Sequence, residues 1–348
     1  MRPEEFDYRL PPELIAQEPI EPRDASRLLV LDRRAEAPGH YRFRDLPRFL
    51  RAGDLLVFND TRVVPARLHA RRCDTGGRAE VLLLRPLSPE EGGRQAWEVL
   101  GRPARRLRAG MHLACEKGGL EVVVTAVLPE GLRQVELVWD AGESLVRVLE
   151  QAGEIPLPPY IHRPLADGER YQTVYAHRPG SAAAPTAGLH FTPGLLEDLR
   201  AGGVEMCYLT LHVGLGTFRP IRTETVEEAS LHAEYYRVEG RAAAAVNVAR
   251  RRGSRVVAVG TTVVRTLETA ATPAGEVRPG EGWTDLFIYP GYRFRVVDAL
   301  VTNFHLPRSS LLMLVCALAG TDRVLAAYRE AVNQRYRFYS FGDAMLIV

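Results

Sequence analysis

Four apolar runs that each end in polar residues or glycine constrain the fold of this chain most strongly. The runs cover residues 53–60, 204–214, 254–262 and 299–306. Helical spacing of apolar residues follows three of the runs. Short apolar runs bounded by turn residues are typical of buried strands, and strands that alternate with helices build α/β domains. The sequence therefore predicts an α/β domain with a largely parallel sheet, and it leaves open whether that sheet closes into a barrel.

Capping residues indicate where helices begin and end. Serine, threonine and aspartate suit the N-cap, proline suits the first turn, and glycine suits the residue after the last turn. The expected boundaries are a start at Thr192 and Pro193 with a stop at Gly202, a start at Thr261 or Thr262, and a cap at Asp322.

The segment from about Val63 to Trp139 has a different pattern. It contains short stretches of alternating apolar and polar residues separated by turn residues, which is typical of an antiparallel barrel or sandwich. The proline-rich residues 153–161 suit a return linker. We therefore expect a discontinuous α/β domain of residues 1–62 and 150–348, with an all-β barrel domain of residues 63–149 inserted into it.

Composition excludes several classes of protein. The 348 residues are 46% hydrophobic and 25% charged, which is typical of a globular protein with a sizeable core. The first ten residues contain no apolar stretch of a secretory signal, so we expect a cytoplasmic protein. The apolar run 311–320 is shorter than the ~20 residues that span a bilayer, and it suits a buried helix. Four scattered cysteines indicate neither a disulfide framework nor a zinc knuckle.

The balance of basic residues also restricts the chemistry. Lys117 is the single lysine among 45 lysines and arginines, so Schiff-base enzymes, P-loop hydrolases and kinases are disfavoured. A formal net charge of +2 does not by itself indicate nucleic-acid binding. Basic residues are nevertheless concentrated locally in the segments 71–72, 102–108 and 250–252, which could equally be solvated surface.

Polar residues and glycines stand where the expected strands end. Ligands bind at the carboxyl ends of strands in open α/β sheets, where loops present backbone amides and helix N-termini. The candidate ligand contacts at these ends are Asn59, Thr61, Arg62, Gly214, Gly216, Thr217, Gly260, Thr261, Thr262 and Asn303.

Each of these candidates has a simpler interpretation beside the functional one. Asn59 and Asp60 suit turns, and Thr261 and Thr262 suit helix caps. The glycine pair at 214 and 216 lacks the third glycine of a dinucleotide-binding motif, so it is a weak cofactor signal.

Histidines suggest either a metal site or a proton carrier. The α/β part contains His190, His212, His232 and His305. None of these histidines has the spacing of a known ligand motif, so we expect no metal. A histidine that carries a proton is the better interpretation, with Asp60 or Asp343 as its carboxylate partner or as structural acids.

Seven longer strings carry a resemblance to a known family. In chain order they are FDYRLPPELIAQ, FNDTRVVPARL, PTAGLHFTPGLL, LHVGLGTFRPI, VGTTVVRTLE, TNFHLPRSSLLML and FYSFGDAMLI. From about Phe6 to Ile347 the chain resembles the S-adenosylmethionine:tRNA ribosyltransferase-isomerase family of queuosine biosynthesis. This family combines an α/β domain with an inserted β-barrel.

The resemblance implies a reaction. The ribosyl part of S-adenosylmethionine would be transferred to 7-aminomethyl-7-deazaguanine at the wobble position of tRNA, giving epoxyqueuosine with loss of adenine and methionine. S-adenosylmethionine would be a co-substrate, with no prosthetic group and no metal. The family pattern has a histidine three positions before the one aligned with His232, where this chain has Ala229, which weakens a catalytic role for His232.

The implied chemistry needs a base, a group that stabilises departing adenine, and partners for the methionine carboxylate. Asn303 or a protonated histidine could stabilise the departing adenine. The methionine carboxylate could be bound by helix N-termini at Thr261, Thr262 and Ser309, or by the Arg265 guanidinium. The string PTAGLH adds Thr186 and Gly188 as candidate contacts to S-adenosylmethionine. The candidate bases, without a ranking, are Asp60, His190, His212, His305 and Asp343.

The expected partner is the tRNA anticodon loop carrying the modified wobble base. Splayed bases stack on aromatic side chains, and the candidates are Phe191, Phe218, Phe304 and Tyr339, each of which could equally be a core residue. The arginine segments would hold phosphates, so binding should weaken with salt. We expect a monomer that binds no membrane. A methyltransferase that uses the same donor and a non-catalytic RNA-binding protein remain alternatives, and release of free adenine would exclude the first.

Overall fold

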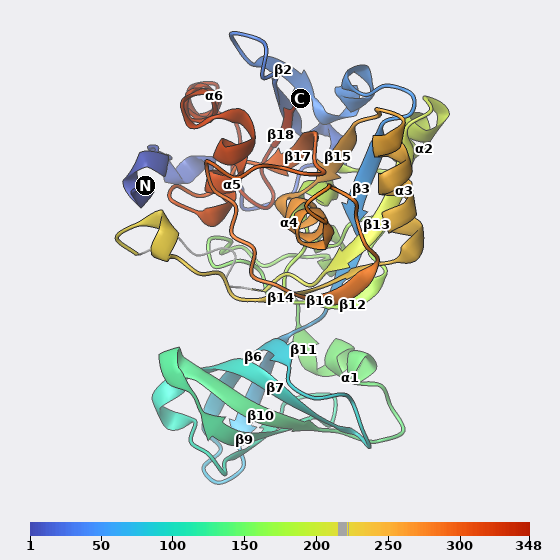
Figure 1. Ribbon diagram of the computed structural model, residues 1–348. Helices are drawn as coiled ribbons and strands as arrows, with labels where there is room; N and C mark the ends of the chain where they lie inside the picture. Colours follow the sequence, from blue (N-terminus) through green and yellow to red (C-terminus); the bar gives the residue numbers. More distant parts are fainter. Residues whose placement is uncertain (215–220, 222) are drawn as a thin grey trace. The chain divides into compact units, whose positions relative to one another are not determined.

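The computed structural model describes residues 1–214, 221 and 223–348, and divides into two compact units (Figure 1). The α/β unit consists of Met1–Thr61, Pro158–Arg178 and Ala184–Val348. The barrel unit consists of Arg62–Leu157 and Pro179–Ala183. Two short strands, β4 (Thr61–Val63) and β12 (Arg178–Ser181), pair with each other as a separate sheet.

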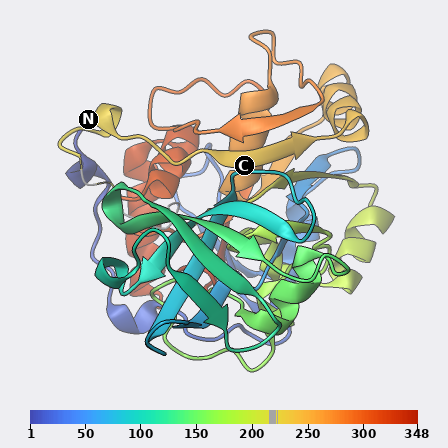
Figure 2. The ribbon, with the colours of Figure 1, turned by 90° about the horizontal axis from the view of Figure 1, so that it is seen from below.

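The barrel unit is a closed antiparallel barrel, as expected from the alternating pattern. Six strands follow one another in hydrogen-bonded order, and β5 also pairs with β8, which closes the sheet (Figure 2). Alternate side chains, such as Leu68, Val99, Val122 and Leu137, fill the interior. The elements are β5 (Arg67–Arg72), β6 (Arg78–Pro86), β7 (Arg94–Arg102), β8 (His112–Cys115), β9 (Glu121–Val127), β10 (Leu132–Val138), α1 (Leu145–Ala152) and β11 (Gly153–Glu154), which adds to β5.

The α/β unit is built on a nine-stranded mixed sheet. Its order is β16 (Gly280–Thr284), β14 (Glu234–Val238), β13 (Glu205–Leu211), β3 (Leu55–Asn59), β15 (Val256–Val259), β17 (Ala299–Asn303), β18 (Ala344–Ile347), β1 (Arg27–Leu31) and β2 (Gly39–Arg42). The central strands β13, β3, β15 and β17 are parallel. The outer pairs are antiparallel, and β18 pairs antiparallel with β17 but parallel with β1.

The expected largely parallel sheet is therefore found only at the centre. The order of the described strands is linear from β16 to β2, so the closure that the sequence left open does not occur in this part of the chain. Of the antiparallel pairs, only β1 and β2 are joined by a short connection, whereas α5 and α6 lie between β17 and β18 in the chain.

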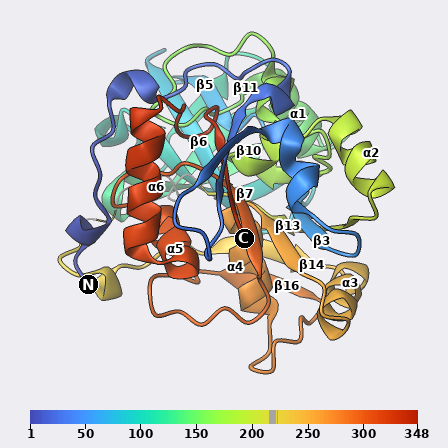
Figure 3. The same ribbon diagram turned by 90° about the horizontal axis from the view of Figure 1, so that it is seen from above.

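Helices cover both faces of the sheet (Figure 3). Successive side chains of a strand point to opposite faces, so a strand whose residues are all buried needs a covering layer on each face. On β3, Leu55 and Val57 pack in the core with α3, α4, α5 and α6, whereas Leu56 and Phe58 pack with α2 on the other face. The helices are α2 (Pro193–Ala201), α3 (Gly240–Arg251), α4 (Thr261–Ala270), α5 (Ser310–Ala319) and α6 (Thr321–Asn333).

Helix ends agree with the caps expected from sequence in one case and differ in two. Thr192 caps α2 by accepting a hydrogen bond from the Leu195 amide, and the helix ends before Gly202. Glycines at φ 94° and 88°, Gly260 and Gly320, precede α4 and α6, so Thr261, Thr262 and Asp322 are not N-caps. A left-handed glycine turns the chain more sharply than a capping threonine or aspartate could.

The apolar run 311–320 forms α5, and most of its side chains are buried, as expected. Across residues 1–214, 221 and 223–348, no single helix is long and apolar enough to cross a membrane. The segments α5 and α6 reach the required length only together, and the chain bends by 116° between them.

Candidate functional site

A pocket lies at the carboxyl edge of the central strands, wholly within the α/β unit. Its walls come from the ends of β15 and β17, the first turn of α4, the start of α5 and the short 3-10 helix η8 (Thr186–His190). Nine of the residues selected from sequence line this pocket: Thr186, Gly260, Thr261, Thr262, Asn303, Phe304, His305, Ser309 and Tyr339. The expectation that strand ends gather polar groups is met for these residues.

The side-chain amide of Asn303, at the end of β17, connects this strand to η8 and to the segment of Tyr339. Its oxygen accepts a hydrogen bond from the Thr186 hydroxyl at 3.1 Å. Its nitrogen donates to the Tyr339 carbonyl at 3.1 Å and contacts Nε2 of His190 at 3.2 Å. Because an amide nitrogen only donates, His190 accepts at Nε2 and donates from Nδ1 to Ser26 Oγ, 2.8 Å away. His190 thus holds Asn303 in place from behind the pocket.

Two helix N-termini contribute to the pocket. Gly260, Thr261 and Thr262 form the entry to α4, and Ser309 caps α5 by accepting from the Leu312 amide at 3.2 Å. The first amides of a helix carry a partial positive charge, which stabilises carboxylates and other anions. The pocket can therefore bind an anionic group next to neutral polar side chains.

An aromatic wall completes the pocket. The rings of Tyr160 and Tyr339 lie 4.7 Å apart at an angle of 56°, and Phe304 adds a third ring. The Tyr160 hydroxyl is hydrogen-bonded to Ser340 Oγ at 2.7 Å. Tyr339 has φ 70°, a backbone conformation that is rare for a non-glycine residue and is found most often at functional sites. Tyr160 was not predicted, because it stands in the expected linker and meets Tyr339 only in the folded chain.

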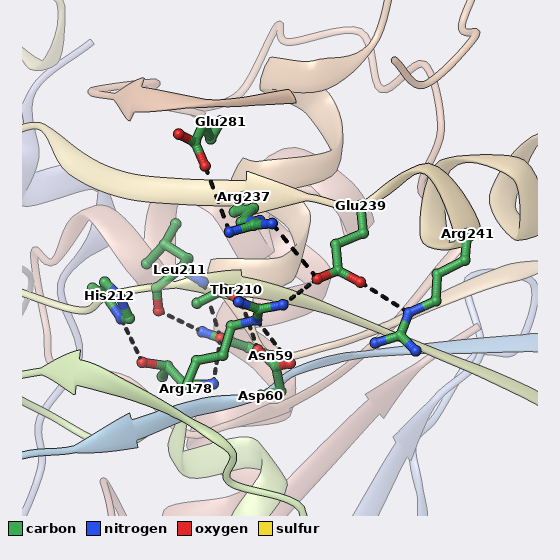
Figure 4. A network of polar contacts seen from close by, with 11 residues as sticks. Asn59, Asp60, Arg178, Thr210, Leu211, His212, Arg237, Glu239, Arg241 and Glu281 are labelled. Carbon is green, nitrogen blue, oxygen red and sulfur yellow. Dashed lines mark hydrogen bonds and ion pairs between the residues drawn. The ribbon is translucent and has the colours of Figure 1, made fainter. Parts of the chain in front are cut away.

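A second polar group lies beside the pocket (Figure 4). Asn59 donates to the Leu211 carbonyl at 2.9 Å and to Thr262 Oγ1 at 3.3 Å, so it is one bond away from the lining. Thr61 Oγ1 and His212 Nδ1 are 2.8 Å apart.

Asp60 belongs to the same group. It accepts a hydrogen bond from the Thr210 hydroxyl at 2.6 Å and faces Arg178, whose Nε lies 3.8 Å from its carboxylate. Arg178 was not selected from sequence, since nothing in its local pattern shows that it meets Asp60.

Burial determines the charge states of the candidate bases. Loss of water lowers the pKa of His190 and of His305 to about 3, and lowers the pKa of His212 to about 4 with a contribution from Arg178. Burial also raises the pKa values of Asp60 and Asp343. The histidines are therefore neutral near pH 7, which disfavours the protonated histidine considered as an acid for adenine.

The structure does not bring Arg265 and Asp343 to the pocket. The Arg265 guanidinium donates to Glu234 and to the Leu286 and Thr284 carbonyls, and both ion-paired side chains are 3% exposed. The Asp343 carboxylate accepts from the backbone amides of Arg27 and Arg337, each at 2.8 Å. Their polar atoms are already engaged in holding the fold, which sequence position alone could not show.

The remaining predicted contacts are placed as follows. Gly188 lies in η8, where an added Cβ would meet the Tyr175 hydroxyl at 2.0 Å, and Gly214 donates its amide to Glu234 at 2.8 Å. Arg62 begins the barrel unit. The exposed His232 does not line the pocket. Gly216, Thr217 and the aromatic candidate Phe218 lie outside the described residues.

The arginine segment 250–252 lies at the other end of the sheet. It ends α3 beside the amino ends of the central strands, where Arg252 bonds Glu205 at 2.7 Å and the Gly53 carbonyl. The structure therefore does not place this segment beside the pocket. The described residues contain no group of three or more histidine, cysteine or acidic side chains that could hold a metal ion.

An α/β sheet with one polar pocket at its strand ends is the architecture of a protein that binds a small molecule there. The chain matches the family model "Queuosine biosynthesis protein" over residues 3–347 and belongs to that family. It is 59% identical to the S-adenosylmethionine:tRNA ribosyltransferase-isomerase of Moorella thermoacetica and 58% identical to that of Symbiobacterium thermophilum, over the full length of all chains.

A solved structure is also similar. The crystal structure of the S-adenosylmethionine tRNA ribosyltransferase from Thermotoga maritima matches with a TM-score of 0.56 and 43% sequence identity, covering 99% of this chain and 100% of that chain.

The buried pair of Arg265 and Glu234 generates a stability prediction. Replacing Arg265 by Met leaves a buried carboxylate without its counter-charge, so the free energy of unfolding should fall by about 3–5 kcal/mol. The double variant Arg265→Met/Glu234→Gln should recover most of that loss. Urea denaturation measures both values, and a single variant as stable as the wild type would contradict the pairing.

The histidines generate a pH prediction. Their folded-state pKa values lie below the value of 6.5 of the unfolded chain, so on acidification the unfolded chain binds protons first. The free energy of unfolding should therefore fall as the pH drops from about 6.5 toward 4, by up to about 1.4 kcal/mol per pH unit for each histidine. Urea denaturation across this range tests it, with His190→Asn expected to reduce the slope. A slope that His190→Asn leaves unchanged would disprove the assignment.

Proposed function

We propose that this protein is an S-adenosylmethionine:tRNA ribosyltransferase-isomerase. It transfers and isomerises the ribosyl moiety of S-adenosylmethionine onto the aminomethyl group of 7-aminomethyl-7-deazaguanine at the wobble position of tRNA. Adenine and methionine leave, and the tRNA carries epoxyqueuosine. The observation that carries the proposal is the pocket at the strand ends, in a chain 58–59% identical to relatives of that name over their whole length.

The pocket suits the donor in charge and shape. The N-termini of α4 and α5 can bind the methionine carboxylate through their positive ends. The rings of Tyr160 and Tyr339 offer an apolar surface for adenine. Asn303 is a positioning residue, since its amide is occupied by Thr186, Tyr339 and His190.

We assign the first proton transfer to His305. A sulfonium acidifies the hydrogens of the ribose 5′ carbon, and a neutral imidazole in the pocket can accept one of them. Nε2 of His305 lies 2.7 Å from Thr302 Oγ1. In the tautomer in which Nε2 donates to this hydroxyl, Nδ1 carries the lone pair that a base requires. Asp60 and His212 do not line the pocket, so they are less suited than His305 to reach the donor.

The two compact units support an inserted barrel domain of residues 63–149 within a discontinuous α/β domain of residues 1–62 and 150–348. Since tRNA is the acceptor, we expect the enzyme to act in the cytoplasm, as a monomer without a prosthetic group or metal.

The activity test is mass spectrometry of suitably modified tRNA after incubation with S-adenosylmethionine, with chromatography of the small products. Free adenine and methionine together with a mass increase on the tRNA are expected. S-adenosylhomocysteine in their place would identify a methyltransferase, and binding without turnover would identify an RNA-binding protein.

The role of His305 is tested by His305→Gln, which keeps a polar side chain and removes the basic nitrogen. Its single-turnover rate of adenine release should fall by about 10²–10⁴-fold, the usual contribution of a positioned base. Thr302→Ser keeps the hydrogen bond to His305 and serves as the control, with a rate near that of the wild type. A His305→Gln variant with the wild-type rate would exclude His305 as the base.

A further inference from the structure

The edge strands β13, β14 and β16 present side chains to solvent on one face. On β14, Glu234 and Val238 are buried while Arg237 is exposed, because alternate residues of a strand point to opposite faces. Register pairs Tyr235 with Trp283 across β14 and β16. Tyr235 and Arg237 therefore share this outer face with Trp283.

Three aromatic rings form a row on this face. The His212 and Tyr235 rings are stacked, with centroids 5.5 Å apart and planes at 21°, and Tyr235 meets Trp283 edge-on at 5.8 Å. Trp283 is 48% exposed, whereas Trp97 and Trp139 of the barrel unit are buried. Cross-strand pairing accounts for the contact between Tyr235 and Trp283, but it does not require a large indole surface in water.

Arginines lie on the same strands as the aromatic row or beside them. The Glu239 carboxylate is shared by Arg178, Arg237 and Arg241 (Figure 4), and the Arg241 side chain is 81% exposed. Asp60 lies 3.8 Å from Arg178, and Glu281 lies 3.8 Å from Arg237. Acids and bases therefore balance here, so individual guanidiniums, and not a net positive field, would contact a phosphate chain.

The row connects to the pocket through hydrogen bonds. His212, at its inner end, contacts Thr61 Oγ1, and the Thr61 amide donates to Asn59 Oδ1 at 3.1 Å. Asn59 in turn donates to Thr262, which lines the pocket. These contacts join the inner end of the row to the pocket lining through the buried side chains of Thr61 and Asn59.

We propose that Tyr235 and Trp283, with the His212 ring stacked against Tyr235, form a platform on which unpaired bases of the tRNA anticodon loop stack while the wobble base occupies the pocket. This inference rests on the proposed function and adds the surface that holds the RNA. Bases stack on exposed aromatic rings of β-sheets irrespective of sequence, and arginines beside them contact the phosphates. The strand β16 is also the edge of the sheet, so pairing with a second copy of the chain is the alternative occupant.

The test measures binding of a synthetic anticodon stem-loop RNA to the full-length protein. Trp283→Ala should raise the Kd roughly tenfold, and Trp283→Phe, which keeps a ring, should recover most of the affinity. The KM for S-adenosylmethionine should not change. Val248→Ala, which shortens an exposed apolar side chain on α3, is the control and should bind like the wild type.

Intrinsic fluorescence gives a second measurement. Stacking of a base on Trp283 should quench wild-type emission, and Trp283→Phe should abolish that quenching while it still binds RNA. Unchanged affinity in Trp283→Ala, or quenching that persists in Trp283→Phe, would overturn the platform. A wild-type dimer in gel filtration that Trp283→Ala converts to a monomer would assign the face to self-association instead.

Adenine release by the wild type, measured in the same preparation, separates the two proposals. Turnover with unaffected RNA binding in Trp283→Ala would refute the platform alone. No adenine release from modified tRNA would refute the proposed function, whatever the binding results.

Discussion

The buried amide of Asn303 is the contact on which the rest of the site depends. It stands where β17 ends and joins both ends of η8, at Thr186 and His190, and the Tyr339 segment by three hydrogen bonds. A buried amide is costly unless its donors and acceptor are satisfied, so these segments are held together at one place. The pocket takes its shape from this constraint.

Burial also sets the chemistry of the surrounding groups. The histidines lose water and stay neutral near pH 7. Positive charge in the pocket comes from the N-termini of α4 and α5, which need no ionisable side chain. Arg265, a buried arginine on α4, forms an ion pair with Glu234 and thereby links α4 to β14.

Much of the fold could be predicted from periodicity. Alternating residues predicted the barrel, and apolar runs predicted the strands of the α/β unit, because burial on one or both faces leaves a repeat in the chain. Antiparallel edges of the sheet were missed, since strand direction depends on how the connections run. Gly260 and Gly320 replaced the expected caps because the turns before α4 and α6 need a positive φ.

The sequence by itself determined the types of element and the strand ends that supply Thr262, Asn303 and His305, because these follow from local pattern. Only the tertiary structure decided that Tyr160 contacts Tyr339 and that Arg265 forms an ion pair with Glu234. It also decided that Arg250–Arg252 lie at the end of the sheet away from the pocket. Contacts between residues far apart in the chain depend on how the sheet is ordered, and no local repeat records that order.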